Sequence, residues 1–489
     1  MVRSSGDGPP SEPLAWGERR ARWVLAATVL GSALTFIDTT VVSIALPSVA
    51  ADLGAGSTGL TWVVNGYTLT LAALVLLGGS LGDRYGRRRI FLIGVGCFAG
   101  ASALCGLAPD VTVLVAARAV QGIGGALLVP TALAILQASF APEHRARAIG
   151  AWSGLTGVAS AVGPFAGGWL VQTTSWRWVF LVNLPVALAV ALIARRHVPE
   201  SRNPAACPQL DVPGAALLVA GLGALTLGLT TASGDDPSVP AAGGALAAGA
   251  VLLAAFLLRE RRARSPLLPP ALFRRRLFVA ANVITFVVYA GLGAVFFVLV
   301  VALQVGAGFS PVAAGLALLP VTVLMLLLSP SAGALVHRVG PRAPMTAGPL
   351  IAALGVLLLG RAGPGAHYLL EVLVPAAVFG AGLTLLVTPL TATVLGALPT
   401  EQAGLASGVN NAVARTAGLL AVAAIPLVGG LGETGLTDPA RLRAGFPVVM
   451  GLCAGLLAAG GLLSAVVLRP PGAREGPEGP GGLRATTHP

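Results

Sequence analysis

Asp38 and Arg118 each interrupt a long apolar stretch of the sequence. A charge near the middle of a membrane costs about 2.5 to 3.5 kcal/mol on insertion scales, so it should face a cavity, be neutralised or have a partner. A buried carboxyl group also binds a proton more readily than an exposed one. Asp38 is therefore a candidate proton carrier. The alternative is a structural acid, bonded to the hydroxyl of Thr39 or Thr40 or permanently paired with an arginine.

Arg118 is the possible partner. At the usual helical rise, Asp38 lies roughly 14 Å, and Arg118 roughly 10 Å, from the outer end of its own apolar stretch. A nearby guanidinium would stabilise the ionised carboxylate, and a cavity that opens and closes could switch its proton affinity. Arg118 could instead be a buried charge that only holds helices together. The sequence leaves open whether the two side chains touch.

The elements that must position these residues are membrane-spanning helices. The chain has 489 residues, of which 55% are hydrophobic and 10% charged. Apolar runs of about 20 residues are long enough to cross a bilayer, so we expect an all-α polytopic membrane protein. Fourteen spans are predicted, at residues 23–49, 60–82, 90–108, 112–138, 149–173, 177–195, 213–232, 241–258, 278–303, 312–335, 343–361, 369–397, 404–429 and 445–468.

The basic residues indicate a topology. All 31 are arginines, and only four of them (Arg177, Arg361, Arg441, Arg443) fall at the outer side when the N-terminus is placed inside. This bias follows the positive-inside rule and predicts that both termini are cytoplasmic. The net charge of +12 is then a topology signal and a contact for lipid headgroups, and it does not indicate nucleic-acid binding.

A faint internal repeat divides the chain. The stretch GSLGDRYGRR at residues 79–88 matches GALVHRVGPR at residues 333–342, although His337 stands where the first copy has Asp83. Such a repeat predicts two six-helix bundles with an inserted helix pair between them. The predicted domains are a cytoplasmic tail (1–22), an N-terminal bundle (23–195), a linker with helices 7 and 8 (196–277), a C-terminal bundle (278–468) and a disordered cytoplasmic tail (469–489).

Four motifs, in order and at their spacing, carry a family resemblance. They are DTTVV with ALP at residues 38–47, the stretch at 79–91, Arg118 with Gln121-Gly122, and GPFAGG at 163–168. From about residue 20 to 468 the chain resembles the fourteen-helix drug:proton antiporters (EmrB/QacA type) of the major facilitator superfamily. The resemblance implies the major facilitator fold and export by alternating access, with proton coupling through Asp38 and Arg118.

The resemblance also assigns roles to two glycine-rich motifs. It implies a conformational latch that fastens the two halves on the cytoplasmic side, made by Gly79, Asp83, Arg84, Gly86, Arg87 and Arg88. It implies an antiporter motif, typical of exporters rather than importers, at Gly163, Pro164, Gly167 and Gly168, although Ala159 stands where the pattern usually has glycine. The residues themselves also allow a topology anchor for the first motif and ordinary close helix packing for the second.

Six further residues are candidates for a substrate cavity. Arg415 is an intramembrane charge of the second half, and the others are polar or aromatic residues within spans. Each could instead serve in structural pairing or as an interface anchor. The set is Asn65, Tyr67, Gln121, Trp152, Asn410 and Arg415.

The expected function is proton-coupled multidrug or antibiotic efflux across the cell membrane, in a bacterial inner membrane. We expect a monomer that exports a lipophilic, neutral or monocationic small molecule and contacts protons and membrane lipids. No phosphate-cradling loop appears, so the energy should come from an ion gradient without a cofactor, and the resemblance implies that the ion is the proton. The four cysteines (Cys97, Cys105, Cys207, Cys453) and five scattered histidines form no metal-site or catalytic pattern, so no enzyme is predicted. The alternative is a proton-coupled importer or an anion carrier of the same superfamily.

Overall fold

The computed structural model describes residues 13–203, 210–235, 238–263, 266–399 and 402–468. Most of the two predicted tails, Cys207 and the side chain of His337 lie outside this description. Fourteen helices in the described residues are long and apolar enough to cross a membrane, which confirms the all-α polytopic fold. The elements are α1 (Arg19–Leu53), α2 (Ser57–Tyr85), α3 (Arg87–Gly106), α4 (Val111–Ser139), α5 (Pro142–Thr173), α6 (Trp178–Leu181), α7 (Asn183–His197), α8 (Val212–Thr231), α9 (Val239–Glu260), η1 (Pro270–Arg274), α10 (Arg276–Val301), η2 (Ala302–Gly306), α11 (Pro311–Leu316), α12 (Leu319–Val339), α13 (Arg342–Leu359), η3 (Tyr368–Leu373), α14 (Val374–Gly396), α15 (Ala403–Val428) and α16 (Pro439–Val467).

Helix ends follow local chemistry. The Asp110 side chain accepts a hydrogen bond from the Val113 N–H and begins α4, as a short acidic side chain does at a free helix N-terminus. Gly86 joins α2 to α3 with a φ of 109°, a backbone conformation that favours glycine. The α2–α3 turn is therefore a single residue, and the two helices reverse direction there.

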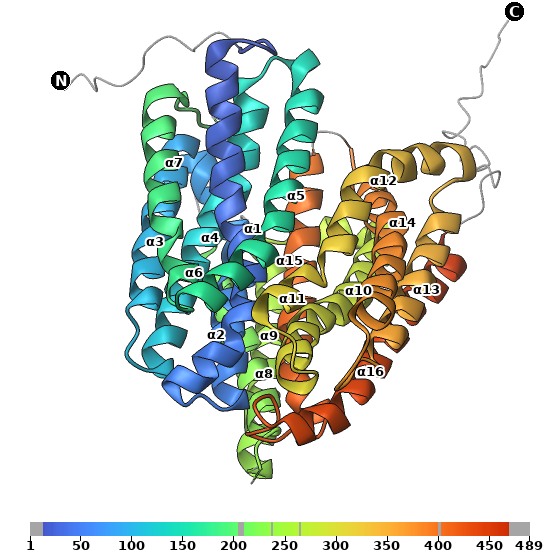
Figure 1. The fold of residues 1–489 in the computed structure, drawn as a ribbon. Helices are drawn as coiled ribbons and strands as arrows, with labels where there is room; N and C mark the ends of the chain where they lie inside the picture. The colour runs from blue at the N-terminus through green and yellow to red at the C-terminus, as the bar shows by residue number, and fades with distance from the viewer. Residues whose placement is uncertain (1–12, 204–209, 236–237, 264–265, 400–401, 469–489) are drawn as a thin grey trace, which may run out of the picture.

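The helices form two groups that meet along one seam (Figure 1). Helices α1 to α7 pack mainly on one another, with α2 and α3 against α4 and α1 against α5. Helices α10 to α16 form the second group, with α13 against α14 and α16, and α10 against α15. We call these groups the N-half and the C-half. The individual domain bounds predicted from the sequence stay a prediction.

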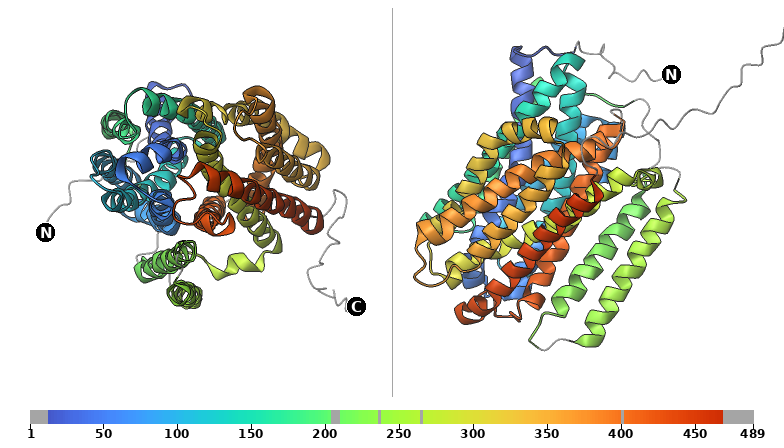
Figure 2. Two further views of the ribbon diagram at one scale, coloured as in Figure 1. Left: turned by 60° about the horizontal axis from the view of Figure 1, so that its bottom comes forward. Right: turned by 90° about the vertical axis from the view of Figure 1, so that its right-hand side faces the viewer.

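The inserted pair α8–α9 stands beside the seam (Figure 2). Helix α8 packs on α2 of the N-half and on α15 of the C-half, while α9 packs on α8. Leu222 of α8 shares an apolar cluster with Leu69 and Ala73 of α2 and with Leu419 of α15. Helix α8 thereby covers the α2–α15 seam with apolar side chains.

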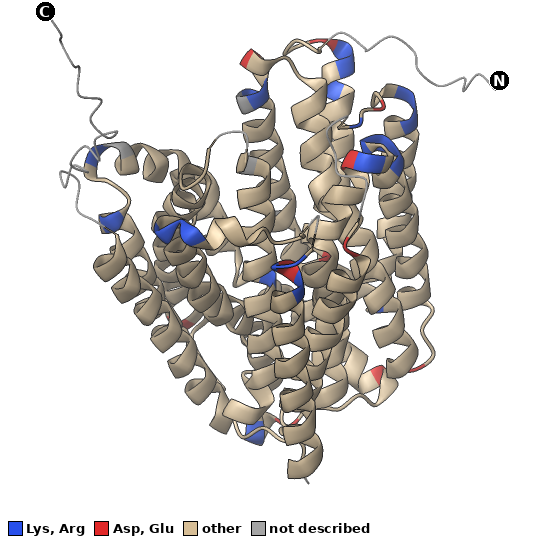
Figure 3. Cartoon of the chain, turned by 180° about the vertical axis from the view of Figure 1, so that it is seen from behind, with Lys and Arg blue, Asp and Glu red and all other residues tan. Residues whose placement is uncertain are grey.

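Charge divides the molecule into two ends (Figure 3). Most arginines gather at the end that carries the α2–α3 turn, which we call the arginine-rich end. The other end carries the α1–α2 connection at residues 54–56 and the α15–α16 connection at residues 429–438. We call it the opposite end.

Two buried carboxyl groups, Asp211 before α8 and Glu260 at the end of α9, lie together at the arginine-rich end of the inserted helices. Asp211 accepts hydrogen bonds from the Gly214 N–H (3.0 Å) and from Arg259 Nε (2.7 Å). Burial raises the pKa of Asp211, but its hydrogen bonds and the Arg259 charge outweigh burial and hold that pKa below its ordinary value. Glu260 accepts from the Leu268 N–H at 2.6 Å. The remaining oxygens, Asp211 Oδ2 and Glu260 Oε1, are buried without a donor among the described residues and both lie against Gly214. A proton shared between the two carboxyl groups would satisfy both oxygens.

We therefore predict that Glu260→Gln leaves the stability unchanged, because a glutamine amide can donate to Asp211. Glu260→Ala should lower the free energy of unfolding by about 1 to 3 kcal/mol, because alanine leaves two buried groups unpaired. Scanning fluorimetry of the detergent-purified variants measures the difference. Equal destabilisation by glutamine and alanine would show that no proton is shared. Glu143→Ala, an exposed change in the first turn of α5, is the control.

Candidate functional site

Asp38 of α1 and Arg118 of α4 form an ion pair inside the N-half. Arg118 Nη1 lies 2.5 Å from Asp38 Oδ2, and each residue is 1% exposed. The question that the sequence left open is thus answered, since the two side chains touch. A buried pair of this kind is stable only when the remaining donors and acceptors of both groups also find partners.

Gln121 supplies some of these hydrogen-bond partners. Its side-chain oxygen accepts a hydrogen bond from Arg118 Nη1 at 2.6 Å, and its amide nitrogen donates to Asp38 Oδ1 at 2.9 Å. The Arg118 Nε–H donates to the Val63 carbonyl of α2 at 3.0 Å. Since Gln121 lies three residues after Arg118 on the same helix, both side chains reach Asp38 from one face of α4. Both carboxylate oxygens of Asp38 are hydrogen-bonded.

Two polar residues that the sequence reading missed extend this network. The Gln121 amide also donates to Ser102 Oγ of α3 at 2.8 Å, and Asn183 Nδ2 of α7 donates to the same oxygen at 3.3 Å. Cys105 Sγ lies 3.7 Å from Gln121 Oε1. The signal was present, because Ser102 and Asn183 are polar residues in apolar spans. The sequence alone does not show that these two side chains meet at one site.

Aromatic rings cover the Arg118 guanidinium. Its Cζ lies 4.4 Å from the centre of the Tyr67 ring and 5.7 Å from that of Phe180, distances at which a cation is attracted to a ring face. The Tyr67 hydroxyl donates to the Thr35 carbonyl at 3.4 Å. Tyr67 and Gln121, both predicted to line a substrate cavity, are fully buried in this network. A role in substrate binding stays a prediction for both.

The predicted proton carrier, Asp38, is thus sealed from solvent and balanced in charge in this structure. The ionised carboxylate is balanced by one guanidinium, and no member of the network is open to solvent. Protonation of Asp38 would remove its charge, so Arg118 would lose its counter-charge and would have to move or be hydrated. If Asp38 took up a proton, α1 and α4 would therefore have to rearrange against each other.

The other four predicted cavity residues have no described hydrogen bond to this network. Trp152 Nε1 donates to Ser32 Oγ at 3.1 Å, and Asn410 Nδ2 donates to Thr285 Oγ1 at 2.7 Å. Arg415 of α15 is half-buried within electrostatic reach of Tyr67 and Tyr289, and it has no hydrogen bond or ion pair among the described residues. Asn65 is fully buried on α2, and neither atom of its amide has a described partner.

The predicted latch at the α2–α3 turn contacts its own half. Asp83 pairs with Arg87 at 2.7 Å, and the Arg87 N–H donates to the Ser201 carbonyl at 2.9 Å. Glu200, which the sequence reading missed, accepts from the Arg88 and Arg89 N–H groups at the start of α3. Its carboxylate lies so close to Gly86 that a Cβ there would be 2.7 Å from Glu200 Oε1. The segment after α7 thus closes over the turn.

The remaining members of the predicted latch surround this contact. Arg88 Nη1 donates to the Val198 carbonyl at 3.2 Å, and the Arg84 guanidinium lies over the Tyr85 ring. A Cβ on Gly79 would lie 3.5 Å from Pro130 of α4, an ordinary contact. In the described residues, none of these hydrogen bonds or ion pairs reaches the C-half.

The GPFAGG stretch of α5 packs on two helices. A Cβ on Gly163 would lie 2.7 Å from Thr40 Oγ1, and one on Gly167 would lie 2.4 Å from Val41, so this face meets α1. A Cβ on Gly168 would lie 2.6 Å from the Pro311 carbonyl oxygen, and one on Gly315 would lie 2.3 Å from the Pro164 carbonyl oxygen. Small residues here let α5 of the N-half touch α11 of the C-half.

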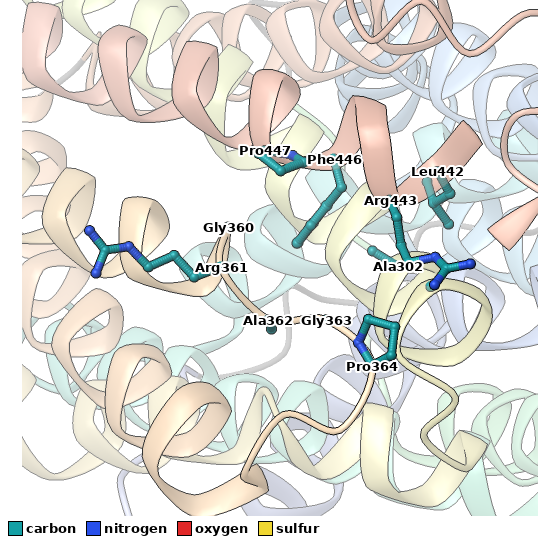
Figure 4. A pocket seen from close by; sticks show the side chains of 11 residues that line it. Ala302, Gly360, Arg361, Ala362, Gly363, Pro364, Leu442, Arg443, Phe446 and Pro447 are labelled. Atoms are coloured by element: carbon teal, nitrogen blue, oxygen red, sulfur yellow. The ribbon is translucent and has the colours of Figure 1, made fainter. Parts of the chain in front are cut away.

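A pocket of about 450 Å³ lies away from these residues, at the opposite end of the C-half (Figure 4). Phe446 and Pro447 of α16 and the segment 360–364 line it. Arg361 and Arg443 flank it, but their guanidinium groups point to opposite sides in Figure 4. None of the predicted site residues lines this pocket.

With this geometry in view, comparison with known proteins decides the family. Residues 28–423 match the Major Facilitator Superfamily. The chain belongs to this superfamily. It is therefore a multi-pass membrane protein of a transporter family, as the sequence motifs indicated. The resemblance drawn from the motifs is confirmed.

Several resistance and export proteins are similar to the chain over most of their length. The chain is 36% identical to a tetracenomycin C resistance and export protein of Streptomyces glaucescens, over 84% of this chain and 76% of that protein. It is 37% identical to a puromycin resistance protein of Streptomyces alboniger (84% and 82%) and 38% identical to a cephamycin export protein of Amycolatopsis lactamdurans (84% and 85%). A crystal structure of a peptide transporter in complex with sulfate shares the fold, with a TM-score of 0.69 at 13% identity over 92% of this chain and 95% of that one.

Proposed function

We propose that this superfamily member exports a lipophilic antibiotic-like compound in exchange for protons. The observation that carries the proposal is the sealed Asp38–Arg118–Gln121 network, which can bind and release one proton only if the helices around it move. The relatives named for resistance or export of antibiotics support the substrate class. We keep the expectation of a neutral or monocationic compound and of a monomer.

The proposed topology places the arginine-rich end in the cytoplasm, with both termini there, and the opposite end outside. The membrane is then a bacterial cell membrane, and the arginines contact its lipid headgroups. We propose the domain bounds 23–195, 196–277 and 278–468 for the two bundles and the linker between them. Helix α8 then forms a fixed wall along one seam.

We propose that the space between the two halves opens toward the cytoplasm in this conformation. The contacts between the halves that involve α1 and α5 lie toward the outer end, where Gln304 donates to the Ile44 carbonyl at 3.1 Å and α5 meets α11. At the cytoplasmic part of α5, a Cβ on Gly150, Gly154 or Gly157 would meet no atom within 4 Å. In this state the described bonds of the turn at Asp83 stay within the turn and the segment after α7. A latch that has released the C-half would show this pattern.

The proton gradient can supply the energy. One proton moving down 100 mV yields about 2.3 kcal/mol, and one pH unit adds about 1.4 kcal/mol. Together these support a gradient of several hundredfold, on the order of 10² to 10³, for a neutral substrate at one proton per cycle. For a monocation the voltage contribution cancels, so the substrate charge and the stoichiometry must be measured together.

A second candidate is an anion carrier of the same superfamily. Arg415 favours it, because this guanidinium near the seam has no ion pair among the described residues, while Asp38 is already paired. An anion bound at Arg415 would bring negative charge to the seam, and a proton that moves with it would fit co-transport better than exchange. Exchange remains our first proposal, because the relatives named for resistance to or export of antibiotics support it.

The test is transport in proteoliposomes that contain a pH-sensitive dye. We expect at least one lipophilic compound of a panel to move in the direction opposite to protons. The proton movement should occur only when that compound is present. Compound movement that leaves the internal pH unchanged would contradict proton coupling. Proton movement in the same direction as an acidic compound would favour the anion carrier.

A further inference from the structure

At the opposite end, a carboxylate of the C-half is bonded to the N-half. Glu433, in the connection between α15 and α16 of the C-half, accepts a hydrogen bond from Thr58 Oγ1 of α2 at 2.5 Å. The Ser57 N–H donates to the Glu433 carbonyl at 2.6 Å, and the Leu436 N–H donates to Ser57 Oγ at 3.0 Å. Among the hydrogen bonds described between the N-half and the C-half, Glu433 supplies the charged side chain.

The start of α2 needs such a partner. The residue before it, Gly56, provides no side-chain cap, so the first N–H groups of α2 are free within their own half. A helix N-terminus carries partial positive charge, and a carboxylate is favourable there. A Cβ on Gly56 would lie 2.2 Å from Glu433 Oε1, so the carboxylate lies directly against this glycine. The C-half thus supplies the cap for a helix of the N-half.

The segment that presents Glu433 is itself held in place. Gly430 and Gly432 have φ values of 58° and 60°, which shape a tight turn after α15. Arg441 at the start of α16 pairs with Asp235, in the connection between α8 and α9, at 2.9 Å. A Cβ on Gly432 would lie 2.0 Å from Asp235 Oδ1. The connection within the inserted pair therefore contacts this segment through Asp235.

We propose that Glu433 is the outer latch of the transport cycle, a positioning residue that holds α2 against the C-half while the arginine-rich end is open. The latch must release Ser57 and Thr58 for the opposite end to open. Its bonds reach α2 through a side chain and a short connection rather than through interlocked helices, so they can break without unpacking either half. The proposal rests on the alternating access proposed above, but its test uses neither substrate nor protons.

The experiment measures how often the opposite end opens. Thr61, one turn into α2 from the latch, is fully buried, so a cysteine there reports opening of this end. The reporter variant carries Thr61→Cys with all four native cysteines replaced, and is placed in nanodiscs with a membrane-impermeant maleimide. We expect Glu433→Ala to raise the labelling rate of this cysteine at least tenfold, which corresponds to about 1.4 kcal/mol. Thr58→Val, which removes the donor to the carboxylate, should give a smaller rise.

Two controls separate a latch from a structural tether. Glu371→Ala removes an acid whose described hydrogen bond stays within its own segment, to the His367 N–H, and should leave the labelling rate unchanged. A second reporter keeps only Cys453, which is buried inside the C-half, and it should stay unlabelled in Glu433→Ala. Equal labelling of Thr61→Cys with and without Glu433 overturns the proposal, as does a rise at both reporters, which would indicate unfolding. A failure of proton-driven export alone would leave these labelling rates, and the latch, intact.

Discussion

Replacing Asp38 by asparagine should abolish proton-driven export, with at least a hundredfold loss of uptake into inside-out vesicles under an imposed pH gradient. Asparagine keeps the size of the side chain and can still accept a hydrogen bond from Arg118, but it cannot carry a proton. Arg118 is then a buried charge without its counter-charge. Breaking a buried pair in this way costs about 3 to 5 kcal/mol. The single variant should therefore lose both coupling and thermal stability.

The double variant Asp38→Asn/Arg118→Gln separates these two effects. Removal of both charges leaves a neutral network that can still be hydrogen-bonded, so the melting temperature should recover toward that of the unchanged protein. Proton-driven export should not recover, because no titrating group remains at the site. Substrate exchange without a gradient tests whether the rest of the cycle survives. Active export by either variant would remove Asp38 from the coupling mechanism.

Much of the fold could be predicted from the sequence because each membrane helix is specified by a continuous run of apolar residues. An apolar run of about 20 residues is a property of neighbouring residues, and the predicted and observed spans agree closely for that reason. The ends differ where polar residues continue a helix beyond its apolar part. Helix α5, for example, begins at Pro142 rather than at residue 149, with Glu143 in its first turn.

The site could be predicted only in part, because partners come from distant segments. Asp38 and Arg118 were identifiable as charges in apolar spans, since such charges need an explanation. Their contact depends on how α1 packs on α4, which no local pattern records. Glu200 and Glu433 lie in polar connections, where acids are ordinary, so their positions against Gly86 and Gly56 could only be found in three dimensions.

The close contact of α5 with α11 carries the second large effect. We expect Gly168→Val to lower active export at least tenfold, because a Cβ at this position would lie 2.6 Å from the Pro311 carbonyl oxygen and 2.9 Å from Val312 Cα. Those atoms are backbone and cannot move aside as a flexible side chain can. Forcing atoms into a packed contact costs about 1 to 3 kcal/mol, which disfavours the closed form of this end by roughly five- to 150-fold. The same export assay used for Asp38 measures the loss.

Gly157→Val is the matched control on the same helix. A Cβ there would meet no atom within 4 Å, so the same change in residue type and helix propensity should leave export within about twofold. Gly315→Val, on the α11 side of the contact, should reproduce the defect, since its Cβ would lie 2.3 Å from the Pro164 carbonyl oxygen. If valine at 157 were as harmful as at 168, the effect would come from the helix itself. If valine at 168 and 315 were both harmless, closure between α5 and α11 would not be required for transport. The antiporter motif would then act only through its packing on α1.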